Sequence, residues 1–285
     1  MIQRAHLTAW QKHAPWDKRS KIEQDLRLSR GIAAIFADTV LAEHLAMRGG
    51  TVLHKGHLAP AARFSEDIDL VLIKPMAKDD LDLRLRAVLT PVLGTPSGSI
   101  IADARLAVRN ARKPSKILRT VFSYVPLGLR YPMTVKVEVN LSENKSLFPL
   151  VEVDVDLLSS AGELTRCRVR SYEIHEMLGT KLRALMQRRL GRDLFDLYHA
   201  AEFGSKATPI CTVDGARTVE ALNWYLASEK EHLGLDEAER SLNDALQTAA
   251  FRNDMEMLLR PDLRRYDIDL AAQLVRNKYL LHLDK

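Results

Sequence analysis

Segment 65–73 reads Ser65-Glu66-Asp67-Ile68-Asp69-Leu70-Val71-Leu72-Ile73 and predicts a β-strand that carries two acids on one face. Side chains along a strand point alternately to opposite sides, so Ser65, Asp67 and Asp69 share one side while the apolar residues at 68, 70 and 72 share the other. The two aspartate Cα atoms are then about 6.5–7 Å apart. Carboxylates this close can bind hard divalent cations, and a two-metal site holds its ions about 3.5–4 Å apart. The strand therefore predicts a metal site at Asp67 and Asp69.

A glycine pair followed by a hydroxyl residue, Gly49-Gly50-Thr51, lies upstream of this strand. Glycine lets backbone N–H groups approach a polyphosphate closely. We expect Gly49, Gly50 and Thr51 to hold the β- and γ-phosphates of an NTP, and Ser65 to contact the same triphosphate. A turn of this kind before a strand with paired aspartates is typical of a nucleotidyl-transfer site.

Acids two residues apart also occur elsewhere, so spacing alone is a weak signal. The strongest rival is Glu152/Asp154/Asp156, which alternates with Val151, Val153 and Val155. It has no glycine turn before it, and we interpret it as a strand with one solvated face.

A second strand supplies a further candidate ligand. In 135–141, VKVEVNL, the valines and leucine share one face and Glu138 lies on the other. If this strand pairs beside 65–73, Glu138 becomes a third carboxylate for the metal site; the alternative is that Glu138 faces water on a half-exposed strand.

A helix beginning at Ser171 contains an unexpected charge. Its apolar stripe has the helical spacing of one face and consists of Ile174, Met177, Leu178, Leu182 and Leu185. Lys181 occupies the remaining position of that stripe, seven residues after Ile174. A buried ammonium needs anionic partners, unless the side chain extends out to water. We favour anionic partners, namely phosphates and carboxylates of a site.

Gly191 is expected to end this helix, and Asp193 and Asp196 follow it. Each aspartate alone is explained by helix capping, Asp193 as N-cap and Asp196 through the helix dipole. Together with Lys181, Arg188 and Arg189, they predict a charged cluster held against the site.

Basic residues are concentrated between 105 and 119. They are Arg105, Arg109, Arg112, Lys113, Lys116 and Arg119. Such a stretch can follow a phosphate backbone, and we assign it, with Arg188 and Arg189, to nucleic-acid binding. A solvated basic helix and loop is the open alternative.

The chain has 285 residues, 46% of them hydrophobic and 28% charged, with a net charge of +5. This is ordinary for a globular protein. It lacks a run of 18 apolar residues and an N-terminal secretory segment, so we expect no membrane association and a cytoplasmic location. Cys167 and Cys211 form neither a metal spacing nor a disulfide framework.

Hydrophobic periodicity predicts an α+β fold with a mixed front half and a helical back half. We expect two lobes, residues 1–165 with the metal site and residues 166–285 completing the nucleotide and nucleic-acid cleft. The predicted elements are a helix at 20–48 with a break at Gly31, a loop at 51–62, strands at 65–73, 117–125, 133–141 and 150–157, a helix at 81–92, a turn at 94–98, the helix from 171, and helices at 215–232, 236–258 and 268–282.

Four segments carry a family resemblance. They are RGGTVLHK at 48–55, RFSEDIDL at 63–70, LGTKLRAL at 178–185 and GRDLFDL at 191–197. In order and spacing they resemble the AbiEii/AbiGii-type nucleotidyltransferase toxins, over roughly residues 10–200. The resemblance implies a polymerase-β-like nucleotidyltransferase core with a mixed sheet and a helical C-terminal lobe. It also implies a toxin of a toxin–antitoxin or phage-defence system, whose relatives add nucleotides to tRNA acceptor ends.

The resemblance assigns roles residue by residue. Ser65 and Asp67 match the active-site serine and the metal-binding aspartate, Asp69 the second aspartate, and Lys181 the phosphate-binding lysine. Asp193 or Asp196 matches the late catalytic aspartate. Gly50-Thr51 departs from the glycine-serine of broader nucleotidyltransferases, which keeps the hydroxyl and adds a methyl group.

We therefore expect a Mg²⁺-dependent enzyme, with Mn²⁺ as a substitute, that uses two metals and an NTP substrate. Its acceptor would be RNA, with the tRNA 3′ end as first candidate, and a cognate antitoxin would be its protein partner. Two alternatives stay open: nucleotidylation of a protein such as the antitoxin, and a non-catalytic nucleotide- or nucleic-acid-binding regulator. The base transferred and the oligomeric state also stay open.

Overall fold

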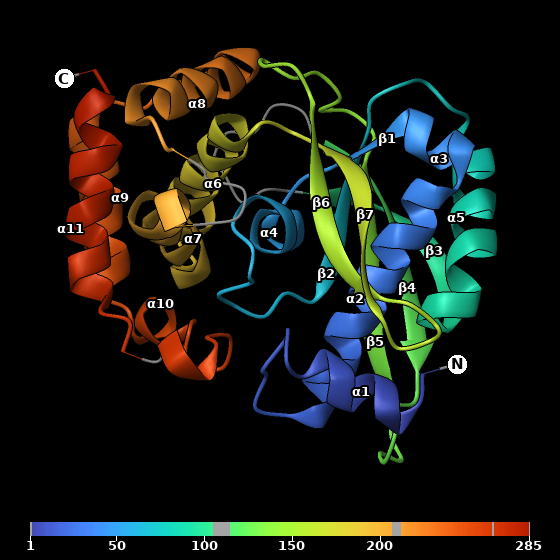
Figure 1. The fold of residues 1–285 in the computed structure, drawn as a ribbon. Helices are drawn as coiled ribbons and strands as arrows, with labels where there is room; N and C mark the ends of the chain where they lie inside the picture. The colour runs from blue at the N-terminus through green and yellow to red at the C-terminus, as the bar shows by residue number, and fades with distance from the viewer. Residues whose placement is uncertain (1, 105–114, 207–211, 264, 285) are drawn as a thin grey trace.

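A seven-stranded mixed sheet forms the front half of the protein. The computed structural model describes residues 2–104, 115–206, 212–263 and 265–284 (Figure 1). The strand order is β3-β4-β5-β2-β1-β7-β6, with β2/β5 and β1/β7 parallel and the other pairs antiparallel. The strands are β1 Leu45–Met47, β2 Asp67–Leu72, β3 Thr95–Ala104, β4 Ser115–Tyr124, β5 Met133–Asn140, β6 Val151–Leu158 and β7 Leu164–Ser171.

Helices from the front half cover the sheet. They are α1 Arg4–Trp10, α2 Arg19–Ala37, α3 Thr39–His44, α4 Gly50–Val52, a π-helix at Leu53–His57, and α5 Lys78–Leu93. Helix α2 crosses close to the sheet at Gly31, where a methyl group would lie only 3.1 Å from Leu93 and 3.2 Å from Ile68. Gly31 therefore permits close packing and does not break the helix, contrary to expectation.

The back half is helical and lies beside the sheet on the left of Figure 1. It consists of α6 Ile174–Arg188, α7 Gly191–Phe203, α8 Gly215–Glu229, α9 Leu235–Leu246, α10 Ala249–Asn253 and α11 Ile268–Lys278, with 3₁₀ turns at Gly204–Lys206, Pro261–Leu263 and Leu280–His282. Helix α6 packs against α7 and α8, and its apolar stripe joins the main core. The α+β class and the helical back half are confirmed.

Several predicted elements agree with the structure. Strands β2, β4, β5 and β6 and helix α5 lie within two or three residues of their predicted bounds. In β6, Val153 and Val155 are buried while Glu152 and Asp154 are exposed, which confirms the strand with one solvated face.

Other predicted elements were wrong. Asp38 ends the 20–48 helix, because its carboxylate accepts from the Leu41 N–H and caps α3 instead. Residues 45–47 form β1, because they pair with β2 on one side and with β7 on the other. The expected loop at 51–62 begins with α4 and the π-helix, and the expected turn at 94–98 is the start of β3.

The remaining errors concern the middle and end of the chain. Strand β7 was not predicted, and its arginines face the acids of β6, with Arg166 Nε 2.9 Å from Asp156 Oδ1. Arg189 in the left-handed region ends α6, while Gly191 begins α7. The 236–258 helix is divided into α9 and α10 because the Thr248 hydroxyl caps a new helix.

The two-lobe division remains a proposal. Because β7 pairs with β6 as far as Ser171, we propose that the first lobe extends to Ser171, beyond the 165/166 boundary expected from the sequence.

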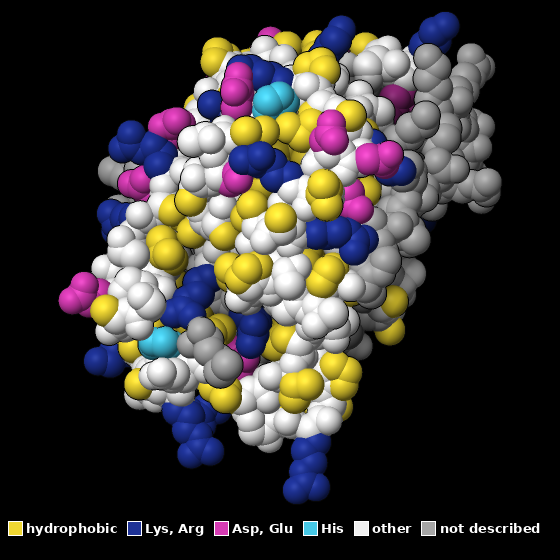
Figure 2. Space-filling view, turned by 90° about the vertical axis from the view of Figure 1, so that its right-hand side faces the viewer, with side chains coloured by type: hydrophobic (Ala, Val, Ile, Leu, Met, Phe, Trp, Pro, Cys, Tyr) yellow, Lys and Arg dark blue, Asp and Glu magenta, His cyan; other side chains and the backbone are white. Residues whose placement is uncertain are grey.

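The helices of the described residues include no candidate for a membrane span. None of those helices is both long and apolar enough to cross a membrane. On the described part of the face that carries α5, basic, acidic and hydrophobic side chains are interspersed (Figure 2).

Candidate active site

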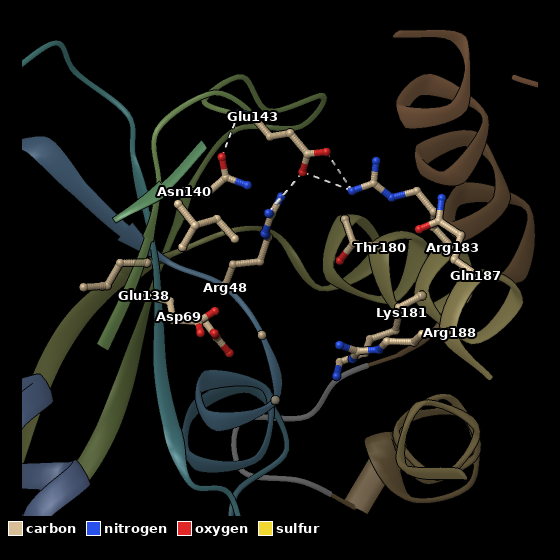
Figure 3. A pocket seen from close by; sticks show the side chains of 15 residues that line it. Arg48, Asp69, Glu138, Asn140, Glu143, Thr180, Lys181, Arg183, Gln187 and Arg188 are labelled. Atoms are coloured by element: carbon tan, nitrogen blue, oxygen red, sulfur yellow. Dashed lines mark hydrogen bonds and ion pairs between the residues drawn. The ribbon is translucent and has the colours of Figure 1, made fainter. Parts of the chain in front are cut away.

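A cleft of about 190 Å³ lies between the sheet and helix α6. Asp69, Glu138 and Asn140 line the sheet side, and Thr180, Lys181, Arg183, Gln187 and Arg188 line the opposite side (Figure 3). Arg48, Gly49 and Gly50 close one end, between β1 and α4. The cleft is therefore lined by residues of both the front half and the back half of the chain.

The sheet brings the predicted carboxylates onto neighbouring strands. In the parallel β2/β5 pair, Asp67 is opposite Lys136 and Asp69 is opposite Glu138. The condition set by the sequence, that 133–141 pairs beside 65–73, is therefore met. Burial and, after it, the nearby charges of Asp67 and Glu138 raise the pKa of Asp69 to about 6, against the opposing charges of Lys181 and Arg48.

Two of these carboxylates already have cationic partners. Lys136 Nζ is 3.0 Å from Asp67 Oδ2, and Arg119 Nε is 2.6 Å from Glu138 Oε1. Within the described ranges, no group of three or more His, Cys, Asp or Glu side chains is arranged to hold a metal ion. Asp67 also lies outside the residues that line the cleft.

The donor chemistry nevertheless fits a hard divalent cation at Asp67 and Asp69. Carboxylate oxygens are the ligands Mg²⁺ uses, and Mg²⁺ needs only one or two of them beside substrate phosphates and water. The raised pKa of Asp69, caused by burial and by the neighbouring acids, indicates excess negative charge that a cation would offset. Arg119 pairs with one oxygen of Glu138, Oε1, so the second oxygen is the one that can join a cation.

Gly49 is in contact with the Asp69 carboxylate. Its φ is +90°, a conformation that side chains disfavour. A methyl group at Gly49 would overlap the carboxylate and lie 2.9 Å from its Cγ. The glycine therefore lets the chain pass directly over the predicted metal ligand.

Gly50 and Ser65 are linked through Arg63, whose role the sequence did not reveal. A methyl group at Gly50 would overlap the Arg63 guanidinium. Arg63 Nη1 donates to the Ser65 hydroxyl at 3.3 Å and to the Phe64 carbonyl at 3.1 Å. Ser65 is half-buried and does not line the cleft.

Thr51 makes a hydrogen bond within the protein. Its hydroxyl donates to the backbone carbonyl of Asp67 at 2.5 Å, and the side chain is buried. The hydroxyl expected to contact phosphates therefore fixes α4 against the start of β2.

Lys181 is buried and meets two carboxylates. Its Nζ lies 3.2 Å from Asp193 Oδ1 and 2.8 Å from Asp196 Oδ2. The anionic partners expected from the sequence are thus present, and the side chain does not extend to water. Arg188 forms a bidentate pair with Asp193, at 2.7 and 2.8 Å.

Asp193 and Asp196 are fully buried behind these cations, and neither lines the cleft. Asp193 is not the N-cap of α7, a position that Leu190 occupies. Both candidates for the late catalytic aspartate contact Lys181.

Asp196 is the centre of a buried network. Arg63 pairs with it in a bidentate manner at 2.6 and 2.8 Å, and His54 Nε2 lies 2.8 Å from Oδ1. Burial opposes ionisation of Asp196, but Arg63 and Lys181 outweigh it and hold the pKa of the carboxyl well below its usual range. Burial lowers the pKa of His54, which therefore donates to Asp196 as a neutral imidazole.

Glu143 connects the two sides of the cleft. Its carboxylate lies 3.1 Å from Arg48 Nη2 and 3.0 Å from Arg183 Nη2. Burial opposes its ionisation, but these two arginines keep the pKa of Glu143 below its usual value. No sequence pattern singled out Glu143, while Arg48 and Arg183 lie inside the resemblance segments without an assigned role.

Only part of the predicted basic surface lies within the described residues. Arg105, Arg109, Arg112 and Lys113 lie outside the described residues, as does the side chain of Lys116. Arg119 pairs with Glu138, while Arg189 is exposed and its Nε lies 3.2 Å from the Ser241 hydroxyl.

Comparisons with known proteins give one family-model match and several structures with a similar fold. The family model described as "Nucleotidyl transferase AbiEii toxin, Type IV TA system" matches residues 31–273. No curated protein matches the chain. MenT4, a nucleotidyltransferase toxin from Mycobacterium tuberculosis H37Rv, has a similar fold, with a TM-score of 0.57, 19% identity, and coverage of 100% of this chain and 91% of that one.

Two structures from Helicobacter pylori are also similar. JHP933 gives a TM-score of 0.53 at 16% identity, covering 93% of this chain and 92% of that one. A putative nucleotidyltransferase gives 0.50 at 17% identity, covering 90% and 92%. At these identities the three structures establish the fold alone.

Proposed function

The chain belongs to the AbiEii family of nucleotidyltransferase toxins, and on that premise we propose that it transfers a nucleoside monophosphate from an NTP to an RNA acceptor. We propose the tRNA 3′ end as the first acceptor to test. The observation that carries the proposal is the cleft itself. Asp69 and Glu138 face it from the sheet, the Gly49 backbone borders it, and Lys181 and Arg188 face it from α6.

The proposed role of each residue follows from its charge. Mg²⁺ or Mn²⁺, bound as a pair of ions by Asp67, Asp69 and Glu138, would supply Lewis acidity at the α-phosphate and at the leaving pyrophosphate. Backbone N–H groups of Gly49 and Gly50, which line the cleft, would contact phosphate oxygens. Lys181 and Arg188 offer positive charge where negative charge grows on the leaving group.

Asp193 and Asp196 are proposed to act through Lys181. An ammonium has three N–H donors, and these two carboxylates occupy two of them. The third can then point into the cleft. Asp193 also fixes the Arg188 guanidinium by two bonds, so both cations meet the triphosphate in a set geometry.

The acceptor RNA is proposed to approach the cleft along Arg188, Arg189 and the basic stretch at 105–119. A toxin of this family implies a cognate antitoxin that controls it. We propose a role in growth control or phage defence. Its substrates would place the reaction in the cytoplasm.

Incubation with labelled NTPs, Mg²⁺ and total tRNA tests the function. Wild-type protein should label RNA, and Asp67→Ala should lower the rate about 100-fold or more, because the variant removes a proposed metal ligand. Asp154→Ala is the matched control, since Asp154 is an exposed acid on β6 outside the cleft. Its rate should equal that of wild type.

Other outcomes would redirect the interpretation. Label on a protein with none on RNA would support nucleotidylation of a protein. No label on either, with each NTP and with Mn²⁺ as well, would favour the non-catalytic regulator. Growth arrest on expression, relieved by Asp67→Ala, would support the toxin role.

A further inference from the structure

Helix α6 presents two chemically different rows to the cleft. Residues seven apart lie two turns apart on the same face. One row is cationic, with Lys181 and Arg188. The other row contains the uncharged Thr180, Ala184 and Gln187 and is bordered by Arg183, which pairs with Glu143. All six residues line the cleft, and Figure 3 labels Thr180, Arg183 and Gln187.

The carboxamide of Gln187 is the unusual group in the uncharged row. Its Nε2 and Oε1 atoms are both buried, and neither has a hydrogen-bond partner among the residues that the structure describes. A buried polar group left without a partner is unfavourable, so such groups are generally satisfied by protein, water or ligand. The Thr180 hydroxyl differs, because it donates to the Met177 carbonyl within α6 at 2.8 Å.

The chemistry of a carboxamide suits a base better than a phosphate. It offers one donor and one acceptor side by side, which matches the paired donor and acceptor on a nucleobase edge. Phosphate oxygens only accept, and the cationic row already provides donors for them. Ala184, one turn before Gln187, adds a small apolar surface on which a base can lie without losing a hydrogen bond.

We propose that Gln187 contacts the base of the incoming NTP and sets which nucleotide is preferred. The inference rests on the proposed function, since it assumes that a triphosphate occupies the cleft beside Asp69. It assigns the two rows to the two ends of the nucleotide, with phosphates at Lys181 and Arg188 and the base at Gln187.

Equilibrium binding of ATP, CTP, GTP, UTP and inorganic triphosphate tests this, using the full chain with Ca²⁺ and no acceptor. Wild type should prefer one or two NTPs by about 10- to 100-fold, the range expected for a bidentate amide–base contact. Gln187→Met keeps the side-chain length but removes the hydrogen bonds. It should reduce the preference to within a few-fold and leave the affinity for inorganic triphosphate unchanged.

Two further variants complete the design. Gln187→Glu keeps the acceptors and removes the donor, so it should change the rank order of the four NTPs. Gln247→Met, at an exposed glutamine after α9, should bind like wild type. Thermal melting of each variant checks that the fold is kept.

Several results would overturn the assignment. Equal affinity of wild type for all four NTPs would do so, as would an unchanged preference in Gln187→Met. An equal loss of affinity for NTPs and for inorganic triphosphate would indicate a phosphate or packing role. If wild type binds neither NTPs nor triphosphate, the proposed function itself fails, which is a separate result.

Discussion

At the scale of single residues, Gly49 determines how closely the chain approaches the predicted metal ligand. Its positive φ and its contact with Asp69 are two separate requirements for glycine. Gly128 meets only the first, because its φ is +87° and a methyl group there would have nothing within 4 Å. Substitutions at Gly49 and Gly128 can therefore separate the effect of backbone strain from the effect of displacing the Asp69 carboxylate.

We predict that Gly49→Ala loses nucleotidyl transfer by about 100-fold or more, since a misplacement near 1 Å at a reacting centre has effects of that size. Gly128→Ala should keep full activity. Both should lower the free energy of unfolding by about 1–3 kcal/mol because alanine disfavours a positive φ, with a further loss for Gly49→Ala from its overlap with Asp69. Urea unfolding and the transfer assay measure the two effects, and equal activity of the two variants would contradict the prediction.

At the scale of elements, buried ion pairs fix α7 to α6 and to the segment before β2. Asp196 on α7 pairs with Lys181 on α6 and with Arg63 in front of β2. Both Asp193 and Asp196 are fully buried, so their charges depend on these partners. The ion pairs of Asp196 therefore help to set the orientation of α6 against the sheet, and with it the width of the cleft.

We predict that Asp196→Asn lowers the free energy of unfolding by about 3–5 kcal/mol, because it leaves buried cations without their counter-charge. Asp262→Asn is the matched control, since Asp262 also pairs with an arginine through both oxygens but is exposed. The control should change the free energy by no more than about 1 kcal/mol. Similar losses in the two variants, measured by urea unfolding, would show that burial of the network is not what matters.

At the scale of the whole molecule, the protein buries several neutral histidines between its two halves. Burial lowers the pKa of His57 to about 4, against the charge of Glu173. It lowers the pKa of His199 to about 3, helped by the neighbouring His54. Between about pH 4 and pH 6.5 these imidazoles take up protons mainly when the chain unfolds, so acid favours the unfolded state over that range.

We predict that the free energy of unfolding of the metal-free protein falls by about 1.4 kcal/mol between pH 6 and pH 5. The stability is fully present above the unfolded histidine pKa and is lost as pH falls toward the lower folded values. Near pH 5.5 the unfolded chain binds about two more protons than the folded chain at His57 and His199. The folded chain binds about one more proton at Asp69, whose pKa is raised to about 6, and this offsets one of the two. His54, whose pKa burial also lowers, adds in the same direction as the other histidines.

Histidine variants identify the source of this slope. His199→Gln should reduce it by about one proton, or about 1.4 kcal/mol per pH unit. His232→Gln, which removes an exposed imidazole, should leave it unchanged. A slope that is the same in both variants would exclude His199 as a cause.

The sequence alone determined the features that depend on local periodicity. Alternation in 65–73 and 133–141 predicted β2 and β5 and put Asp67 and Asp69 on one face. The helical stripe around Lys181 predicted a buried ammonium with anionic partners, because an unpaired charge cannot stay in an apolar face. These inferences need only the geometry of one strand or one helix.

The tertiary structure decided everything that depends on distant contacts. Strand β1 has three residues, too few for a periodic signal, and exists because β2 and β7 border it. The ion pairs of Lys181 and the Glu143 bridge join residues that lie apart in the sequence. The carboxamide of Gln187 has no hydrogen-bond partner among the described residues, which depends on how those residues pack. Burial and pairing are properties of packed surfaces, so no local pattern could specify which charges meet or which polar group remains free for a ligand.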